Sequence, residues 1–575
     1  MAFVDSRYYG SESAVILSHH FGEVRLAIAA KQQKQAVAGG GPADIGASAP
    51  PSVLATHGAG SVASAILLSR IAGLLRESIF AHYLGNSAAA DAFKAGFRIP
   101  NILQNLFGEG VLSASFIPVY SKLLGDGEEE TADLLACGFG ALLGLAIAVL
   151  VLIGVLAAPW LIDAIAPGFS GDKRELTIAI VRILFPGAGL LVMSAWCLGV
   201  LNSHHRFFAS YAAPVAWNAA LIATLLWFGR RTTHDGLAID LAWGSVAGAG
   251  LQVLVQLPQA LALLTRIRLR FSSIATPLRT VFSNLLPVIM GRGVGQVSSY
   301  VDNLLASLLP TGAVAALNYG QTFFMLPTSL FGVSVAAAEL PTLSRVTGSA
   351  EQVGAILRAR INAGLRQIAF LVVPSAAAFF LLGDVIAALV YQSGEFTHAN
   401  ALYVWAVLAG YGVGLLATTM VRLYISAFYA LLDATTPFRF ALVRVTLTLA
   451  LGWFAALLLP HMLGIDRKWG VAGLSATSGM AAWIEFTLLR WRLNQRVGWT
   501  GLDRAFLTKL WTIALGAAGV AFALKQFEAG HGPRAVGLTV LPLYGLLYLG
   551  GAYVLRIPEV KRVGGMIRRR FDRPV

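Results

Sequence analysis

Long uninterrupted runs of apolar residues dominate this chain, and residues 134–161 and 536–554 are two clear examples. A helix needs about 20 apolar residues to cross the hydrocarbon of a bilayer. A chain that crosses it must satisfy every backbone polar group internally, as a helix or as a closed barrel. The runs show no polar alternation, so we predict an all-α membrane protein with many spans.

The composition supports the same prediction. Hydrophobic residues make up 57% of the chain and charged residues 13%, whereas soluble proteins carry about 25% charged residues. The net charge of +14 does not indicate nucleic acid, because the basic residues lie between the apolar runs and at the C-terminus. Cys137 and Cys197 stand inside apolar runs, which favours buried thiols over a disulfide or a metal site.

Fourteen candidate spans follow residues 1–57, which we predict to be a disordered cytoplasmic tail. The spans begin near Ser61, Ala90, Leu134, Leu176, Ala209, Leu237, Thr280, Ala313, Ala363, Ala401, Phe440, Val471, Leu507 and Val536. A weak repeat, Leu106-Phe107-Gly108 and Leu330-Phe331-Gly332, marks the ends of spans two and eight. It predicts a six-plus-six plan, a common arrangement in transporters.

The predicted boundaries follow from this repeat. We expect an N-lobe of six spans at 58–270, a C-lobe of six at 271–498, two extra helices at 499–556 and a basic cytoplasmic tail at 557–575. Lysine and arginine are concentrated after spans six, eight and twelve and in the tail. The positive-inside rule therefore predicts that both termini are cytoplasmic.

Charged residues within spans are informative because each costs about 2.5–3.5 kcal/mol at a helix centre and usually faces a cavity or a partner. In the first span, Arg70 and Glu77 share one helical face. Arg76 points about 120° away from Arg70, by the period of the helix. We expect Arg76 either to reach a cavity from its edge or to extend towards the membrane surface.

The second span carries a continuous polar stripe in which residues follow at steps of three or four. Its members are Asp91, Lys94, Arg98, Asn101, Asn105 and Glu109. Pro100 removes one backbone hydrogen bond and should kink the helix. We favour a hydrophilic transport cavity for this stripe, and the alternative is an ion-pair network that only holds helices together.

Further charges within spans are Arg292, Asp302, Arg422, Arg444 and Glu485. For each of these alone, pairing between helices is at least as good an explanation as binding. Together, the arginines predict a cationic interior, and the planar fork of arginine suits a diphosphate. The candidate substrate-binding residues are Arg70, Arg76, Glu77, Asp91, Arg98, Asn105, Glu109, Arg292, Arg422 and Arg444.

Enzyme signatures are missing from the sequence. It has no phosphate-binding loop of the G-x-x-x-x-G-K-[ST] type, so we expect no ATP hydrolysis by this chain. No long external loop carries paired carboxylates or a histidine cluster for acid–base catalysis. We therefore predict a transporter without a cofactor, driven by a monovalent cation gradient or by the membrane potential.

Several motifs resemble the MurJ (MviN) family of lipid II flippases over roughly residues 61–556. In the first two spans these are Ser69-Arg70-Ile71-Ala72-Gly73, Arg76-Glu77, Asp91-Ala92-Phe93, Phe97-Arg98-Ile99-Pro100-Asn101 and Phe107-Gly108-Glu109-Gly110. In the second half they are Val301-Asp302, Gly332-Val333, Leu340-Pro341 and Phe428-Tyr429-Ala430 with Asp433.

The resemblance implies a fold of the multidrug/oligosaccharidyl-lipid/polysaccharide exporter superfamily in the bacterial inner membrane. Two lobes would alternate around a cationic cavity, and the two extra helices at 499–556 would form a groove for a lipid tail. The implied cargo is lipid II, the undecaprenyl-diphosphate precursor of peptidoglycan, and cell-wall synthesis proteins are conceivable partners. By matched position, Arg70, Arg76, Glu77, Asp91, Arg98 and Glu109 belong to the charged pattern of the family.

The chain departs from the family pattern at several positions. Gln104 and Asn105 stand where the family usually has arginine, and Thr322 replaces another arginine. In span eleven, Thr448 and Gly452 stand where the family often has asparagines near a sodium site. We hypothesise that Arg292 and Arg444 compensate for the lost charge.

Three other functions remain open from the sequence. The chain could export another polyprenyl-diphosphate glycan, such as an O-antigen unit. It could be a membrane glycosyltransferase or ligase, although its external loops are short for such an enzyme. It could also be a non-transporting relative that scaffolds a cell-wall complex.

Overall fold

The computed structural model describes residues 54–264, 274–336, 339, 350–431, 433–528 and 530–560. In this part of the chain the regular structure is helical, and the sole β-bridge recorded joins Ser393 and Phe396. The all-α prediction is therefore confirmed for the described residues. Most of the predicted tail at 1–57, most of the tail at 557–575 and the predicted lobe boundary at 270 lie outside them.

The contacts divide the chain into two units, Met1–Ala59 and Gly60–Val575. The first half of the helices consists of α2 (Leu54–Leu84), α3 (Ala88–Phe107), α4 (Glu109–Ser115), α5 (Ile117–Gly125), α6 (Glu129–Ile165), α7 (Gly171–Ser203), α8 (Phe207–Phe228) and α9 (His234–Leu261). We call these helices the N-group.

The second half, which we call the C-group, continues from α10 to α20. It consists of α10 (Ala275–Ser307), α11 (Ala313–Pro327), the π-helix η2 (Thr328–Val333), α13 (Ala350–Leu381), α14 (Gly383–Tyr391), α15 (His398–Ala430), α16 (Thr435–Trp453), η3 (Phe454–Leu458), α17 (Leu459–Leu463), η4 (Arg467–Trp469), α18 (Gly470–Val497), α19 (Arg504–Phe527) and α20 (Pro533–Val554). Each predicted span start lies inside one of the long helices. Sequence analysis did not predict the short helices α4, α5 and α14.

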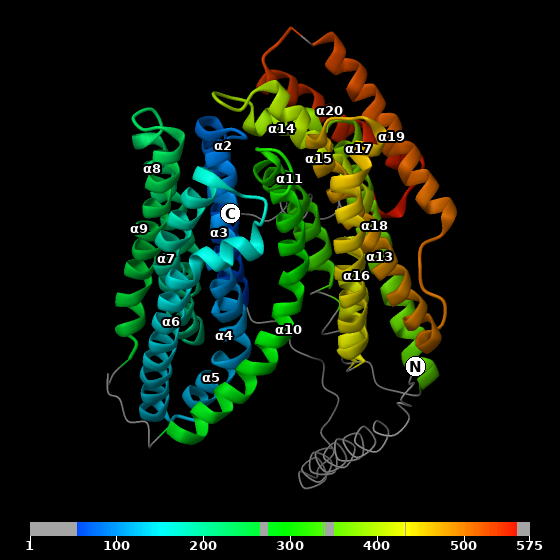
Figure 1. Cartoon of the computed structure of the whole chain (residues 1–575). Helices are drawn as coiled ribbons and strands as arrows, with labels where there is room; N and C mark the ends of the chain where they lie inside the picture. Colours follow the sequence, from blue (N-terminus) through cyan, green and yellow to red (C-terminus); the bar gives the residue numbers. More distant parts are fainter. Residues whose placement is uncertain are drawn as a thin grey trace, which may run out of the picture. The chain divides into compact units, whose positions relative to one another are not determined.

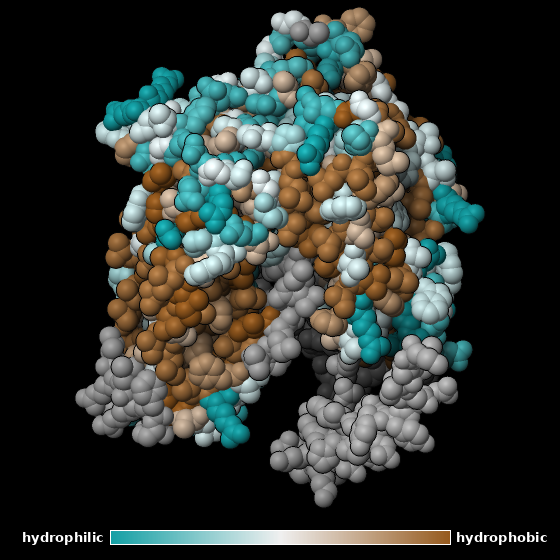
Figure 2. All heavy atoms as spheres, in the orientation of Figure 1, coloured by the Kyte–Doolittle hydropathy of each residue, from teal (hydrophilic) through white to brown (hydrophobic). Residues whose placement is uncertain are grey.

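Within the described residues, nine helices are long and apolar enough to cross a membrane. On the face in Figure 2, hydrophobic side chains cover the flanks of the helices, and hydrophilic side chains gather at the upper end of the view. An apolar belt of this kind suits hydrocarbon, where no water competes for side chains. The chain is therefore a multi-pass membrane protein.

Helices pack chiefly with others of their own group (Figure 1). In the N-group, α7 contacts α3, α6 and α9, while α15 of the C-group contacts α11, α13 and α18. Small residues allow the closest crossing, because a Cβ atom on Gly414 of α15 would lie 2.1 Å from Cα of Gly479 on α18. Close backbone approach at small residues is the usual way in which membrane helices associate.

The C-terminal pair α19 and α20 docks on a proline in α13. Pro374 has no N–H group, so the carbonyl of Phe370, four residues earlier, loses its helical donor. The Tyr548 hydroxyl of α20 donates to that carbonyl at 2.6 Å, and the Tyr544 hydroxyl donates to the Pro374 carbonyl at 2.6 Å. The two extra helices are thereby fastened to the C-group at the backbone site that the proline leaves open.

The first residues of the predicted basic C-terminal tail pack against the C-group. Ile557 is buried, and the Glu559 carboxylate accepts a hydrogen bond of 2.8 Å from Nε of Arg366 on α13. Burial of Ile557 and this ion pair extend the packed region four residues beyond 556.

Candidate functional site

The first charged site lies between α2 and α3. Gly85, with φ of 49°, turns the chain after α2, and Ser87 caps α3 by accepting a hydrogen bond of 3.2 Å from the Ala90 amide. This tight turn returns α3 along α2. Glu77 and Lys94, which are 17 residues apart in sequence, therefore meet.

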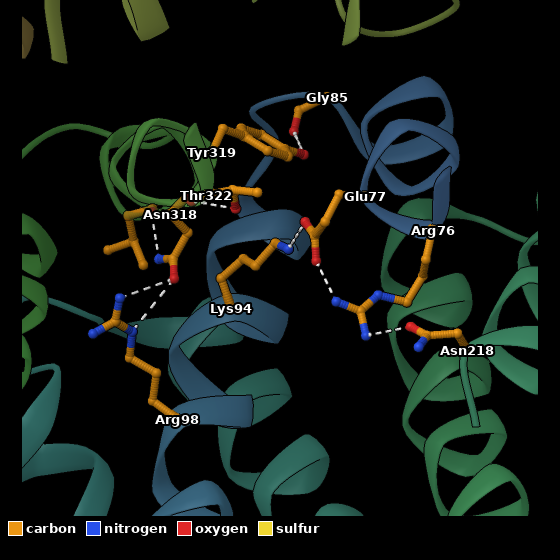
Figure 3. Close-up of polar contacts among 10 residues, drawn as sticks. Arg76, Glu77, Gly85, Lys94, Arg98, Asn218, Asn318, Tyr319 and Thr322 are labelled. Atoms are coloured by element: carbon orange, nitrogen blue, oxygen red, sulfur yellow. Dashed lines mark hydrogen bonds and ion pairs between the residues drawn. The ribbon is translucent and has the colours of Figure 1, made fainter. Parts of the chain in front are cut away.

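Glu77 bridges two cations (Figure 3). Its carboxylate accepts hydrogen bonds from Nη2 of Arg76 at 2.7 Å and from Lys94. Arg76 also donates to Oδ1 of Asn218 at 3.1 Å and lies over the Trp217 ring at 4.8 Å. Of the two positions expected for Arg76, these contacts correspond to the one that points to the interior.

Arg98 extends this site towards the C-group. Its Nη2 donates to Oδ1 of Asn318 at 3.1 Å, and it also bonds Gln321 on the same helix, α11. The Tyr300 hydroxyl of α10 donates to the Arg98 carbonyl at 3.2 Å. We call Arg76, Glu77, Lys94 and Arg98 the cationic cluster, since it holds three basic groups and one carboxylate.

Lys94 belongs to the polar stripe but is not among the candidate binding residues predicted from the sequence. Lys94 is largely buried, and its ammonium lies 4.2 Å from the centre of the Phe80 ring. The signal that could have selected it is its position one turn after Asp91 and one turn before Arg98.

Asp91 has a different environment from the rest of the stripe, because it caps another helix. Its carboxylate accepts hydrogen bonds of 2.7 Å from the backbone amides of Gly312 and Ala315 at the start of α11. Lys173 of α7 donates to it at 2.6 Å, and the residue is 1% exposed. Gly312 has φ of 94°, a conformation that favours glycine. Asp91 thus fastens α3 and α7 to the C-group rather than facing open space.

Other contacts join the two groups at the same end of α2. The Ser78 hydroxyl donates to the Val390 carbonyl at 2.5 Å, and the Glu395 amide donates to the His82 carbonyl at 2.9 Å. The His82 ring lies 3.0 Å from the Ser393 hydroxyl. We call these contacts, together with those of Asp91, the Gly85 junction.

Four further candidates, Arg70, Asn105, Glu109 and Arg292, are not among the residues of the cationic cluster. Arg70 is exposed and donates to the Ser329 hydroxyl of η2 at 3.1 Å. Asn105 is partly buried in the last turn of α3. Glu109 begins α4 and Arg292 belongs to α10, but their side chains lie outside the part of the structure that is described.

A second charged site lies within the C-group, in a cavity of about 300 Å³. Its charged lining residues are Asp302 of α10, Arg422 of α15, Arg444 of α16 and Glu485 of α18. Nη1 of Arg444 donates to Oε2 of Glu485 at 3.1 Å. We call these four residues the paired-charge cavity.

The paired-charge cavity brings together two predicted arginines with two acids that sequence analysis noted but did not select. Asp302 is 6% exposed and Glu485 is 2% exposed. The signal for these acids in the sequence was a charged residue inside an apolar span. Their pairing with arginines could not be derived without the helix packing. Among the described residues, two arginines and two carboxylates line this cavity, whereas the cationic cluster holds three basic groups and one carboxylate.

Comparison with known proteins identifies the fold and the relatives. Residues 80–535 match the family described as "Lipid II flippase MurJ". The chain is 30% identical over 477 residues to the probable lipid II flippase MurJ of Rhizobium meliloti, covering 81% of this chain and 85% of that protein. It is also 30% identical to the lipid II flippase MurJ of Burkholderia cenocepacia, covering 86% and 96%.

Solved structures share the same fold. A lipid II flippase MurJ in an inward closed conformation aligns with a TM-score of 0.69 at 21% identity, covering 86% of this chain and 98% of that one. An inward-facing multidrug transporter of the MATE family and MOP superfamily aligns with a TM-score of 0.58 at 16% identity, covering 76% and 98%. The two sequence alignments cover most of this chain and most of each relative. From these alignments and the family match, we conclude that this chain belongs to the MurJ family.

Proposed function

We propose that this protein is a lipid II flippase, which moves the undecaprenyl-diphosphate-linked peptidoglycan precursor from the cytoplasmic leaflet to the outer leaflet of the inner membrane. The observation that carries the proposal is the cationic cluster, where the N-group and the C-group meet. The excess positive charge of the cluster suits an anionic head group. Relatives of this chain in the MurJ family are called lipid II flippases.

In the proposed mechanism, the diphosphate replaces Glu77 as the partner of Arg76 and Lys94. Glu77 now pairs with both cations, which lowers the cost of burying them before the cargo arrives. A diphosphate offers more acceptor oxygens than a carboxylate, and arginine can bind it with two parallel hydrogen bonds. Arg98, which bonds neutral amides of α11, would supply the further charge from the side of the C-group.

The Gly85 junction is the proposed outer gate. If the chain before α2 is cytoplasmic, α2 crosses the membrane once, and its C-terminal end lies at the outer surface. The contacts of Asp91 and of His82 then close the path to the outside. Release of cargo requires these contacts to break, so that the cationic cluster becomes open to the outer leaflet.

The polyprenyl tail would travel along α19 and α20. Large apolar side chains on these helices are exposed, such as Val520, Leu538 and Leu546. Because α19 and α20 dock on α13 through the Pro374 site, they would remain with the C-group as the two groups move. We propose residues 58–270, 271–498 and 499–556 as the two lobes and the tail-binding pair.

Replacement of the native flippase tests the proposal. A bacterium whose own lipid II flippase is under a repressible promoter should grow after repression when it expresses this chain. Absence of growth, despite normal amounts of the chain in the membrane, would contradict the proposed function. A chain carrying Arg439→Ala, on the exposed start of α16, is the matched control for substitutions in the cationic cluster.

The alternative cargo needs its own experiment. Purified protein in vesicles should give outer-leaflet lipid II accessible to an added membrane-impermeant enzyme. The same vesicles loaded with another polyprenyl-diphosphate glycan should give little exposure. Preference for the second lipid would identify the chain as an exporter of another glycan, and exposure of neither would favour a scaffold.

A further inference from the structure

The family resemblance implies a sodium site near span eleven, which is α16 here, and the residues present are poorly suited to one. Thr448 is fully buried and supplies one hydroxyl oxygen, which has no hydrogen-bond partner among the described residues. Gly452 offers no side-chain oxygen, and a Cβ atom there would meet Leu305 and Leu474 at 2.9 Å.

Arg444 lies one helical turn before Thr448 and brings a fixed positive charge to the same region. It donates to Glu485 at 3.1 Å and lines one cavity with Asp302. Arg444 therefore stands between buried acids that belong to two different helices, α10 and α18.

The charge balance of the paired-charge cavity argues against an added cation. Among the described lining residues, Arg422 and Arg444 already match Asp302 and Glu485 in number, so a sodium ion would add a third positive charge to two negative ones. Repulsion between like charges is strong where the surroundings are poor in water. One oxygen of Asp302 has no hydrogen-bond partner among the described residues, but the two guanidinium groups face the same space.

We infer that Arg444 acts as a tethered cation in the paired-charge cavity, and that it takes the place of an exchangeable sodium ion. Arg444 on α16 supplies the positive charge that the two acids on α10 and α18 require, so no ion has to enter or leave the cavity. Sodium should then neither stabilise this protein nor drive its transport cycle.

The first test measures heat stability and does not depend on the cargo. The full-length protein in detergent is heated in sodium chloride, potassium chloride and choline chloride at equal ionic strength. We expect the same unfolding midpoint in all three salts. A higher midpoint in sodium chloride alone would overturn the inference, because a bound ion stabilises the folded state.

Substitution of Arg444 by a neutral residue should make the heat stability of the protein depend on sodium. Arg444→Gln removes one positive charge from the cavity and leaves Asp302 and Glu485 in excess. Sodium chloride should then raise the unfolding midpoint by about 1–2 °C relative to choline chloride. Arg444→Lys keeps the charge and should behave as the unchanged protein does, and so should Arg439→Ala on the same helix. A folded Arg444→Gln protein without any response to sodium would contradict the inference.

If Arg444→Gln does not fold, transport by the unchanged protein decides the matter. Vesicles with and without an inward sodium gradient should flip lipid II at equal rates. A rate that rises with the gradient refutes the tethered cation. Equal rates support it, whereas failure to flip lipid II under both conditions counts against the proposed function and leaves the stability result to judge Arg444.

Discussion

The cationic cluster and the paired-charge cavity both place arginines inside membrane-spanning helices, yet they differ in balance. In the cluster, Glu77 pairs with both Arg76 and Lys94, and Arg98 bonds amides of α11. Among the described residues that line the cavity, Arg422 and Arg444 stand with Asp302 and Glu485, and Arg444 pairs with Glu485. Buried charges that lack partners are costly. The number of charges in a span is therefore a poor guide to a binding site, and the excess over their partners is a better one.

The two sites also differ in position. The cluster lies where α2 and α3 approach α11, between the N-group and the C-group, so its surroundings must change if the groups move. The cavity is lined by helices of the C-group alone. We therefore expect the cluster to bind and release cargo, while the cavity keeps its ion pairs through the cycle.

The largest expected effect comes from Arg76. Arg76→Ala should lower the rate of lipid II flipping by about 100-fold or more, because it removes charge-assisted hydrogen bonds to the diphosphate. Arg76→Lys should restore only part of the rate, since an ammonium lacks the planar fork. Flipping in vesicles and growth after repression of the native flippase measure both.

The comparison would fail if Arg422→Ala, in the balanced cavity, abolished flipping as Arg76→Ala does while the protein stayed folded. Arg439→Ala serves as the control for expression and insertion, because that side chain is exposed.

Asp91→Asn should have the next largest effect. It breaks a buried pair with Lys173, a change that typically costs about 3–5 kcal/mol, and it weakens the cap of α11. The Gly85 junction should open more often, and flipping should fall about tenfold. A cysteine at Ser393 should then react faster with a membrane-impermeant maleimide.

Labelling of Cys137 and Cys197 in the protein without the added cysteine sets the background for this measurement. Unchanged reactivity at position 393 in folded Asp91→Asn protein would remove Asp91 from the proposed gate.

Neutralising one acid in each site sharpens the comparison. Glu77→Gln frees Arg76 and Lys94, so the cargo should bind several-fold more tightly while release slows. Glu485→Gln leaves Arg444 without its partner, so it should lower the unfolding midpoint and leave cargo affinity unchanged. Lipid II binding and thermal unfolding, measured on both proteins, separate the two effects.

Similar results for the two variants would contradict the difference in role that we assign to the two acids. In particular, a loss of lipid II affinity in folded Glu485→Gln protein would place cargo at the paired-charge cavity.

A surface ion pair provides the smallest effect and the reference for the others. Asp433, between α15 and α16, accepts hydrogen bonds from Thr436 and pairs with Arg496 at 2.6 Å. Burial would raise the pKa of Asp433, but Thr436 and Arg496 outweigh it and hold the pKa at about 2, below the usual 3.8. Asp433→Asn should cost less than about 1 kcal/mol of stability.

The pH dependence of that small contribution follows from the lowered pKa. It is fully present above pH 3.8 and is lost as the pH falls towards 2. Between pH 5 and 8 the difference in unfolding midpoint between Asp433→Asn and the unchanged protein should stay constant. A difference that varies over this range would show that another group titrates with the pair.

The helices and the candidate charges could be predicted from sequence because their causes are local. An apolar run that enters a bilayer must become a helix, and each predicted span start lies inside one. Charges in such runs are conspicuous, so Arg76, Arg422 and Arg444 were found without a structure. The contact of Glu559 with Arg366 could not be predicted, because the two residues lie far apart in the sequence.

The sequence by itself determined that this chain is a helical membrane protein with many buried charges, because spacing and hydropathy act over a few helical turns. Only the tertiary structure decided what each charge contacts. Asp91 caps a helix whose Ala315 is 224 residues away, and Arg444 meets Glu485 across 41 residues. Such pairs depend on how helices pack, so the excess charge of the cationic cluster and the balance of the paired-charge cavity became visible only when the helices were in place.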